Sequence, residues 1–356
     1  MSVPVEGPVL VVGSGLLGAS VGLALRRAGV AVWIDDVDPV CLDQALERGA
    51  GEPWDSTRDT PRLVVVAVPP ASAGAVMAEA MRFPDATITD VTSVKGAPLA
   101  SAIASGADPA RLVGGHPMAG REKSGPGAAR MELFDDRPWV VTPTAGTAQE
   151  RVQEVIDLAR TCGAVPFVMD PDEHDEAVAL TSHAPQLISS LLAARLLDAD
   201  AQAVAVSGQG LRDMTRIAGS DPHLWRAILS ANADSVAGVL EAFSDDLERV
   251  VSDLRSGDGA EVASALTRGS AGRERVPGKH GDAATAYDVV TAIVKDEPGE
   301  LARLFVAAGD LGINLEDVRI DHVLGKPSGL IELSVRPEAS ARLREGLIDL
   351  GFDVRA

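Results

Sequence analysis

The segment from Val9 to Gly29 places the strongest limit on how this chain can fold. The apolar run Val9-Leu10-Val11-Val12 is typical of a buried strand, and it leads directly into Gly13-Ser14-Gly15-Leu16-Leu17-Gly18. A helical pattern then continues to Ala28, where Gly29 is a typical helix-terminating residue. In a G-x-G-x-x-G turn the first glycine allows the bend, the second lets a ligand approach the backbone, and the third lets helix and strand pack closely. The segment therefore predicts a strand, a turn and a helix whose free amides bind phosphate.

An acidic residue after the second strand indicates which dinucleotide this turn binds. The strand pattern ends at Asp35, at the distance where a carboxylate accepts hydrogen bonds from a ribose diol. Such a carboxylate repels a ribose phosphate and no arginine follows it directly, so the sequence favours NAD over NADP. Asp36 and Asp38 are alternative acids, and an inward-folded Arg58 or Arg62 would weaken the preference. A flavodoxin-like turn without a dinucleotide is the less favoured interpretation.

The alternation of strand and helix patterns continues as far as residue 169. A helical pattern covers 71–82, and further strand-type runs cover 63–68, 86–91, 139–142 and 164–168. Parallel strands joined by crossover helices follow from this order. We therefore expect an α/β, Rossmann-type dinucleotide-binding domain over residues 1–169.

A glycine-rich segment contains the most distinctive histidine of the chain. His116 stands in Gly114-Gly115-His116-Pro117-Met118-Ala119-Gly120, and this glycine density predicts a loop. Histidine titrates near neutral pH and suits proton transfer, although a lone histidine is more often structural. A strand expected over 111–113 delivers His116 to the carboxyl edge of the sheet, where open sheets bind ligands. Ser93 is expected at the same edge, either near the His116 ring and a substrate hydroxyl or as the cap of the helix after Gly96.

From residue 170 the pattern becomes helical. Asp170-Pro171 is a cap followed by a first-turn proline, and the helix expected over 172–197 contains Pro185, which should kink it. Further helices are expected near 203–207, 222–254 and 261–267. We expect an all-α domain over residues 170–280 that contributes to substrate binding and dimerisation.

Two arginines in the helical region are candidates for binding an anionic substrate. Arg212 and Arg216 lie four residues apart with Asp213 between them. Guanidinium groups bind carboxylates through paired hydrogen bonds, and Asp213 would hold one of them in place. The same spacing is more often a solvated helix face.

The end of the chain predicts a third, smaller domain. A linker rich in glycine and charge is expected over 269–284. The patterns that follow are a strand at 287–294, a helix at 300–308, strands at 315–323 and 329–335, a helix at 339–350 and a strand at 352–355. This βαββαβ order predicts a ferredoxin-like domain over residues 285–356.

Composition and charge exclude several classes of function. A net charge of -20 argues against nucleic acid as a partner, while a small anionic substrate stays compatible because the field of a site is local. The longest apolar run is too short to span a bilayer and the first residues lack the basic start of a signal peptide, so we expect a cytoplasmic protein without membrane contact. Cys41 and Cys162 predict no disulfide framework. His174, Asp175 and His183 lack the spacing and number of a metal site, so no metal is predicted.

Five ordered motifs along nearly the whole chain resemble those of prephenate and arogenate dehydrogenases. They are the glycine turn at 13–18, Asp90-Val91-Thr92-Ser93-Val94-Lys95-Gly96, the run at 114–120, Thr181-Ser182-His183-Ala184-Pro185 and Asp213-Met214-Thr215-Arg216-Ile217-Ala218. The tail, from Asp296-Glu297-Pro298-Gly299-Glu300-Leu301 to Gly312-Ile313-Asn314, is similar to ACT regulatory domains, which bind amino acids at domain interfaces.

The resemblance implies NAD-dependent oxidative decarboxylation of prephenate to 4-hydroxyphenylpyruvate, a step of tyrosine synthesis. It implies that His116 accepts the ring hydroxyl proton as hydride passes to the nicotinamide, that Ser93 orients hydroxyl and imidazole, and that Arg216 binds a substrate carboxylate. Further positions that match the substrate pocket are Glu122, Lys123, Ser182 and Asp213.

The sequence departs from the family pattern at Gln186, where the family often has a histidine. This position concerns recognition of the substrate side chain, so arogenate and 4-amino-4-deoxyprephenate are alternative substrates. An NAD-binding amino-acid sensor without turnover is the alternative from another class, and the complete set of Ser93, His116 and Arg216 argues against it. The resemblance also implies a homodimer built through the helical domain and feedback by tyrosine at the ACT domain.

Overall fold

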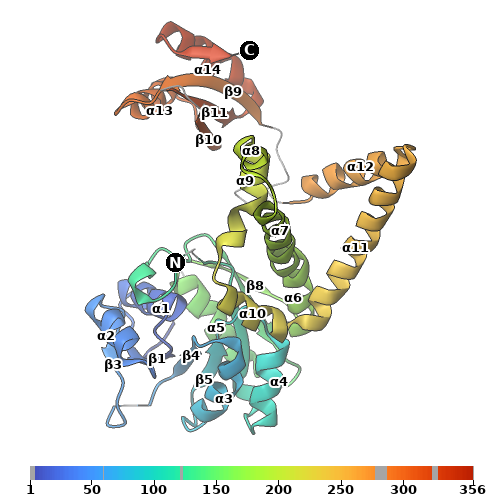
Figure 1. Cartoon of the computed structure of the whole chain (residues 1–356). Helices are drawn as coiled ribbons and strands as arrows, with labels where there is room; N and C mark the ends of the chain where they lie inside the picture. The colour runs from blue at the N-terminus through green and yellow to red at the C-terminus, as the bar shows by residue number, and fades with distance from the viewer. Residues whose placement is uncertain (1–4, 59, 121–122, 277–286, 323–327, 356) are drawn as a thin grey trace. The chain divides into compact units, whose positions relative to one another are not determined.

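The computed structural model describes residues 5–58, 60–120, 123–276, 287–322 and 328–355, and the chain forms two compact units, Met1–Asp245 and Asp246–Ala356. The first unit is built on an eight-stranded sheet with the order β3-β2-β1-β4-β5-β6-β7-β8 (Figure 1). Its strands are β1 Val9–Val12, β2 Val32–Asp35, β3 Glu52–Pro53, β4 Leu63–Val66, β5 Thr87–Asp90, β6 Leu112–Pro117, β7 Pro138–Pro143 and β8 Val165–Val168. The predicted Rossmann-like α/β architecture is confirmed.

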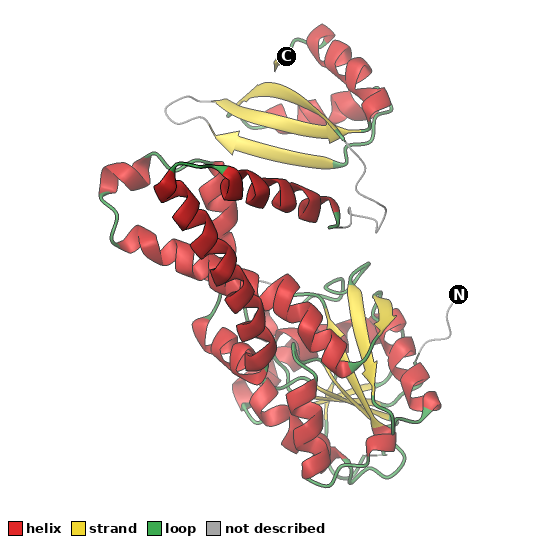
Figure 2. Cartoon of the chain, turned by 90° about the vertical axis from the view of Figure 1, so that its right-hand side faces the viewer, coloured by secondary structure: helices red, strands yellow, loops and turns green. Residues whose placement is uncertain are grey.

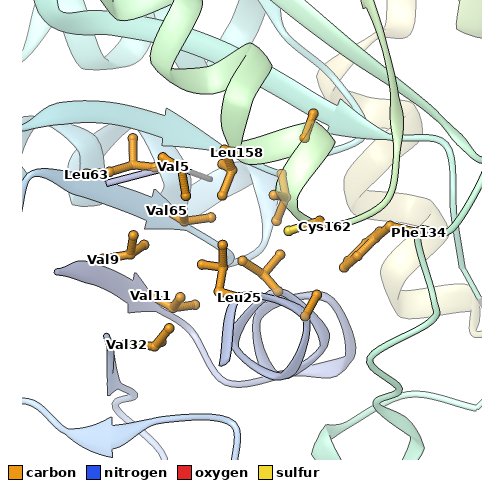
Figure 3. Close-up of a cluster of buried hydrophobic side chains, with 14 of the residues drawn as sticks. Val5, Val9, Val11, Leu25, Val32, Leu63, Val65, Phe134, Leu158 and Cys162 are labelled. Carbon is orange, nitrogen blue, oxygen red and sulfur yellow. The ribbon is translucent and has the colours of Figure 1, made fainter. Parts of the chain in front are cut away.

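Helices cover both faces of this sheet because its buried strands are apolar on both sides. One core cluster joins Val9 and Val11 to helices α1 (Leu16–Arg27), α2 (Pro39–Glu47) and α5 (Gln149–Thr161), and Figure 3 shows Leu25 and Leu158 among its side chains. The other cluster joins Leu10 to helices α3 (Pro70–Ala80) and α4 (Gly96–Ala104). This packing leaves the carboxyl ends of β1, β4, β5 and β6 at one common edge.

The expectation that residues 114–120 form a loop is wrong for the first four of them. Gly114 to Pro117 belong to the buried strand β6. The two glycines are needed for close packing, because a Cβ on Gly114 would lie 2.1 Å from Thr142 Oγ1 and one on Gly115 would lie 2.6 Å from the Asp90 carbonyl oxygen. The glycine density therefore reflects neighbouring strands that leave no room for a side chain, and His116 is held by a sheet.

One strand departs from the expected parallel arrangement. β7 pairs antiparallel with β6, whereas the other neighbouring pairs in the sheet are parallel. A parallel partner needs a crossover helix, and the described residues between β6 and β7 contain only the short 3-10 turn η2 (Pro126–Ala128).

The rest of the first unit is helical, as predicted. A capping box at Asp170 starts the first of these helices, and the kink expected near Pro185 is a π-helical turn that ends two residues before it. The segment between the helices expected near 203–207 and 222–254 contains a helix of its own. The elements are α6 Pro171–Val178, η3 Ala179–His183, α7 Ala184–Ala194, η4 Arg195–Leu197, α8 Ala201–Ala205, α9 Gln209–Thr215, η5 Arg216–Gly219, α10 Pro222–Ala231 and α11 Ala233–Ser256, whose last residues belong to the second unit.

The second unit contains a four-stranded antiparallel sheet of order β10-β11-β9-β12. Figure 2 shows it as a yellow layer with helices on one side, and buried side chains from α13 and α14 form the core with alternate strand residues. Helix α12 runs through Glu274, so the linker expected to begin at 269 is helical in its first part. The elements are α12 Ala260–Glu274, β9 Asp288–Lys295, α13 Glu300–Asp310, β10 Asp317–His322, β11 Ser328–Val335, α14 Pro337–Asp349 and β12 Asp353–Arg355. Within the described ranges, no helix is both long and apolar enough to cross a membrane.

Candidate active site

The glycine-rich turn after β1 has the geometry of a phosphate-binding site. Gly13 has φ +99°, and a Cβ there would lie 2.4 Å from the Ala67 carbonyl oxygen. A Cβ on Gly18 would lie 1.9 Å from the Gly13 carbonyl oxygen, so the third glycine is needed for packing. A Cβ on Gly15 would meet no atom of the described residues within 4 Å, and among them no side chain caps the start of α1. The second glycine therefore leaves the helix amides open to a ligand, as a dinucleotide pyrophosphate requires.

The acid beside this turn is Asp36, one of the two alternatives to Asp35. Asp36 Oδ2 accepts hydrogen bonds from the Ser14 amide at 2.5 Å and the Ser14 hydroxyl at 2.7 Å. Asp35 contributes its backbone carbonyl, which accepts from the Gly13 amide at 2.8 Å. Of the two adjacent acids, Asp36 is therefore the one whose carboxylate lies against the glycine turn.

Both arginines that would favour a ribose phosphate form ion pairs elsewhere. Arg58 pairs with Glu52 at 2.8 Å, and Arg62 pairs with Glu6 at 2.6 Å. The turn therefore presents a carboxylate and open helix amides, and these groups fit NAD.

A buried ion pair holds Gly115, the residue directly before His116. The Lys95 ammonium, fully buried, donates to the carboxylate of Asp90 at the end of β5 and to the Gly115 carbonyl oxygen at 2.5 Å. Asp90 Oδ1 also accepts from the Gly115 amide at 3.2 Å. Both backbone groups of the residue before His116 are thus tied to one charged pair, which fixes the position of this histidine on the sheet edge.

On its other side His116 contacts helix α6. His116 Nδ1 lies 2.8 Å from His174 Nε2, and His174 Nδ1 lies 2.8 Å from Asp175 Oδ1. The Asp175 carboxylate also accepts from the amides of Lys95 and Gly96, both at 2.8 Å. The three side chains form a continuous line from the sheet edge to the first helix of the helical region.

The surroundings of His116 keep its imidazole neutral. Burial is the main cause that lowers its pKa well below the ordinary 6.5, and the positive charges of His174, Lys95 and His183 would lower it further. The side chain is 8% exposed. A neutral imidazole has a free lone pair, so His116 can accept a proton at neutral pH.

A third buried histidine, His183, belongs to the same region. Asn232 Nδ2 donates to the Asp175 carbonyl oxygen at 2.8 Å and lies 3.2 Å from His183 Nδ1. Burial lowers the pKa of His183 to about 4. The Trp225 ring meets His183 edge-on at 6.0 Å between centroids. Among the described residues, no three His, Cys, Asp or Glu side chains form a group that could hold a metal ion.

The remaining predicted site residues lie in several places. Ser93 is half-buried after β5 and does not cap α4, whose N-cap is Lys95 without a side-chain hydrogen bond. Ser182 is half-buried in η3, Lys123 is exposed, and Glu122 lies outside the described residues.

Arg216 and Gln186 are brought together through the backbone. Arg216 is exposed at the start of η5. Gln186, 5% exposed on α7, donates from Nε2 to the carbonyl oxygen of Ile217 at 2.9 Å. Asp213 accepts from Gln209 at 2.9 Å.

Sequence reasoning missed the residues that hold His116. Lys95 and Asp90 were noted only as members of a motif, and His174 and Asp175 were considered only as metal ligands. The sequence did contain a signal for this pairing: Asp90 stands at the end of a strand and Lys95 follows it closely. Charged side chains at such a position are buried only when they are paired.

A dinucleotide-binding turn and a buried, neutral histidine at the carboxyl edge of one sheet define a dinucleotide-dependent dehydrogenase. The sequence matches the family models of the prephenate dehydrogenase nucleotide-binding domain over residues 21–168 and the prephenate dehydrogenase dimerization domain over residues 170–268. It is 37% identical over 346 residues to the probable prephenate dehydrogenase NovF of Streptomyces niveus, covering 94% of this chain and 95% of that protein. The chain therefore belongs to the prephenate dehydrogenase family.

Solved structures of two relatives have the same fold. The prephenate dehydrogenase from A. aeolicus in complex with hydroxyphenyl propionate and NAD+ has a TM-score of 0.67 and 29% identity, over 74% of this chain and 96% of that chain. The arogenate dehydrogenase of Synechocystis has a TM-score of 0.66 and 26% identity, over 75% of this chain and 99% of that chain.

We expect substitution at Asp36 to weaken NAD binding more than the same substitution at Asp35. A hydrogen bond to a charged group contributes about 1.5–3 kcal/mol, so Asp36→Asn should raise the Kd for NAD roughly tenfold to a hundredfold. Asp35→Asn is the matched control, and calorimetry with NAD measures both. A larger increase for Asp35→Asn would assign the ribose contact to Asp35.

Proposed function

We propose that this enzyme oxidises prephenate with NAD and releases carbon dioxide, giving 4-hydroxyphenylpyruvate for tyrosine synthesis. The observation that carries the proposal is His116, a neutral histidine buried at the same sheet edge as the dinucleotide turn. Oxidation of the prephenate ring alcohol gives a dienone whose ring carboxylate leaves as carbon dioxide, and aromatisation makes the step irreversible. NAD, when bound, accepts the hydride from the alcohol carbon.

The residues of this chain then carry the proton and position the substrate. His116 accepts the proton of the ring hydroxyl, and Ser93 orients the hydroxyl and the imidazole. Arg216 binds a substrate carboxylate, and Asp213 braces its surroundings. Glu122, Lys123, Ser182 and Gln186 complete the substrate pocket, and the glycine turn with its acid holds the dinucleotide.

Substrate turnover tests the proposal directly. NADH formation should be faster with prephenate than with arogenate or 4-amino-4-deoxyprephenate, and kcat/KM should stay level as the pH falls to 6.5, because the lowered pKa keeps His116 neutral. Equal or better turnover of arogenate would overturn the substrate assignment. A protein that binds NAD but oxidises none of the three would be a sensor.

Two substitutions should separate the chemical step from substrate binding. His116→Asn removes the base, so kcat should fall about 10²- to 10⁴-fold while the Kd for NAD stays unchanged. Arg216→Ala removes a charge-assisted hydrogen bond of about 1.5–3 kcal/mol, so the KM for prephenate should rise roughly tenfold to a hundredfold.

Arg212→Ala is the matched control for Arg216→Ala, because Arg212 is also exposed but donates to the Ser207 carbonyl oxygen at 3.2 Å. Its KM should stay near that of the wild type. Loss of NAD affinity in Arg216→Ala would place this arginine in the cofactor site.

We further propose three domains: a dinucleotide-binding domain at 1–169, a helical substrate and dimerisation domain at 170–280, and an ACT domain at 285–356 that binds tyrosine. The βαββαβ element order and the sheet order β10-β11-β9-β12 support the ferredoxin-like assignment of the last.

Tyrosine should inhibit the full chain and should no longer inhibit after removal of residues 285–356. The measurement is the tyrosine concentration that halves NADH formation at fixed prephenate, compared with phenylalanine as the control amino acid. Inhibition that persists in the shortened chain would move the tyrosine site to the active site.

The helical region also supports a homodimer. Large apolar side chains are exposed along it, among them Leu180, Leu191, Leu197 and Phe243. Exposed apolar surface of this kind is covered in oligomers. We expect sedimentation to give the mass of two chains and Leu191→Glu to shift it towards one, with Leu301→Glu as the control in the second unit; a wild-type monomer would contradict this.

A further inference from the structure

We propose that His174 and Asp175 fix the tautomer of His116 and take up the positive charge that forms when His116 accepts a proton. In this role His174 is a positioning residue that accepts the proton passed on by His116, and the Asp175 carboxylate stabilises the charge that His174 then carries. The chemical part of the inference rests on the proposed function, whereas the tautomer is a property of the protein without substrate.

The argument starts from Asp175, whose charge fixes the direction of each hydrogen bond in the line. Burial acts to raise the pKa of this carboxyl, but hydrogen bonds from His174, Gly96 and Lys95 outweigh it and hold the pKa below its ordinary value. Asp175 is therefore ionised at neutral pH, and a carboxylate can only accept hydrogen bonds.

The proton positions along the line follow from this charge. His174 Nδ1, at 2.8 Å from Asp175 Oδ1, must carry a hydrogen. In a neutral imidazole the other nitrogen is then bare, so His174 Nε2 can only accept. The atom that faces it at 2.8 Å is His116 Nδ1, which must donate. The remaining nitrogen of His116, Nε2, is left with a free lone pair.

The opposite tautomer of His116 would be costly. With its hydrogen on Nε2, His116 would turn a bare Nδ1 towards the bare Nε2 of His174, and two lone pairs would face each other at hydrogen-bond distance. Both side chains are buried, at 8% and 0% exposure, so water does not relieve an unmade hydrogen bond there. The structure thus selects the form of His116 in which Nε2 is the base.

The same three side chains also provide an acceptor for the proton that the reaction releases. When His116 Nε2 takes the substrate hydroxyl proton, its Nδ1 hydrogen can pass to His174 Nε2. One proton enters at His116 and one moves to His174, which then carries the positive charge at 2.8 Å from the Asp175 carboxylate. His116 itself becomes neutral again.

The other charged groups around the pair make this transfer favourable. The Lys95 ammonium, between β5 and α4, acts against a positive charge on His116, whereas His183, in η3, is neutral because burial lowers its pKa to about 4. Asp90 is already paired with Lys95. Among the residues that the structure describes, Asp175 is therefore the carboxylate available to a positive charge on the two histidines, and it contacts His174 directly.

Nitrogen NMR on the free enzyme tests the tautomer without any substrate. The chain has six histidines, so a sample labelled with ¹⁵N-histidine gives few ring signals, which single-histidine variants assign. We expect His116 and His174 both to carry hydrogen on Nδ1 with a bare Nε2 at pH 7.5. A wild-type spectrum with hydrogen on His116 Nε2 would overturn the proposal, whatever substrate the enzyme uses.

Two variants of His174 separate positioning from charge uptake. His174→Phe keeps a ring of similar shape but offers no acceptor, so His116 should lose its single tautomer and kcat should fall about a hundredfold or more with little change in KM. His174→Gln can accept from His116 and donate to Asp175 but cannot take a proton. It should keep the Nδ1 tautomer of His116 and lose about tenfold in kcat.

Controls make each outcome decisive. His223→Phe is the matched substitution of an exposed histidine on α10 and should leave kcat and the His116 spectrum unchanged. If His174→Phe does not fold, the spectrum and kcat of His174→Gln decide. A folded His174→Phe with one His116 tautomer and kcat within about threefold of wild type would refute the role of His174. Intact tautomers in an enzyme that turns over no substrate would instead refute the proposed function alone.

Discussion

The buried ion pair between Lys95 and Asp90 is the interaction on which the arrangement of the site depends. An ammonium and a carboxylate without water are costly unless each is fully hydrogen-bonded. Here the carboxylate accepts from Lys95 and from the amides of Thr92 and Gly115, while Lys95 also donates to the Gly115 carbonyl oxygen. The pair thus needs the end of β5, the turn after it and β6 in one arrangement, and His116 follows Gly115 directly. Removal of one partner would leave a buried charge, at a cost of about 3–5 kcal/mol.

Asp175 connects the helical region to this edge of the sheet in the same way. Its carboxylate accepts from the amides of Lys95 and Gly96, at the N-terminal end of α4, where a negative charge is favourable. Because it also accepts from His174, one side chain fixes both the turn that carries Lys95 and the histidine beside His116. Burial is the main cause that lowers the pKa of His116 and keeps it neutral, and the positive charge of Lys95 adds to this effect. The negative charge of Asp175 lies on the far side of His174. His116 therefore lies between opposite charges, the Lys95 ammonium on one side and the Asp175 carboxylate beyond His174 on the other.

The sequence was sufficient to predict the parts of the fold that local patterns determine. The glycine turn, the alternating elements, the helical region and the βαββαβ order all follow from periodicity and from residues with special backbone requirements. The sequence was insufficient where contacts between distant segments determine the structure. Gly114 and Gly115 lie in a strand because Thr142 and Asp90 leave no room beside them, and neither neighbour can be read from the local pattern. The choice between Asp35 and Asp36 depends on which of two adjacent side chains reaches Ser14, and a strand end one residue longer or shorter reverses it. His174 was visible, but its partner lies 58 residues away.

At Gln186, where the family often has a histidine, the side chain of this protein has a structural role. As a candidate substrate contact, its carboxamide would offer a donor and an acceptor. In the structure one N–H of Nε2 is used, because it donates to the carbonyl oxygen of Ile217, the residue after Arg216. Gln186 therefore acts on the backbone that carries Arg216. A carboxamide is neutral, so it adds no positive charge to this part of a chain of net charge -20, whereas Arg216 beside it is an exposed cation.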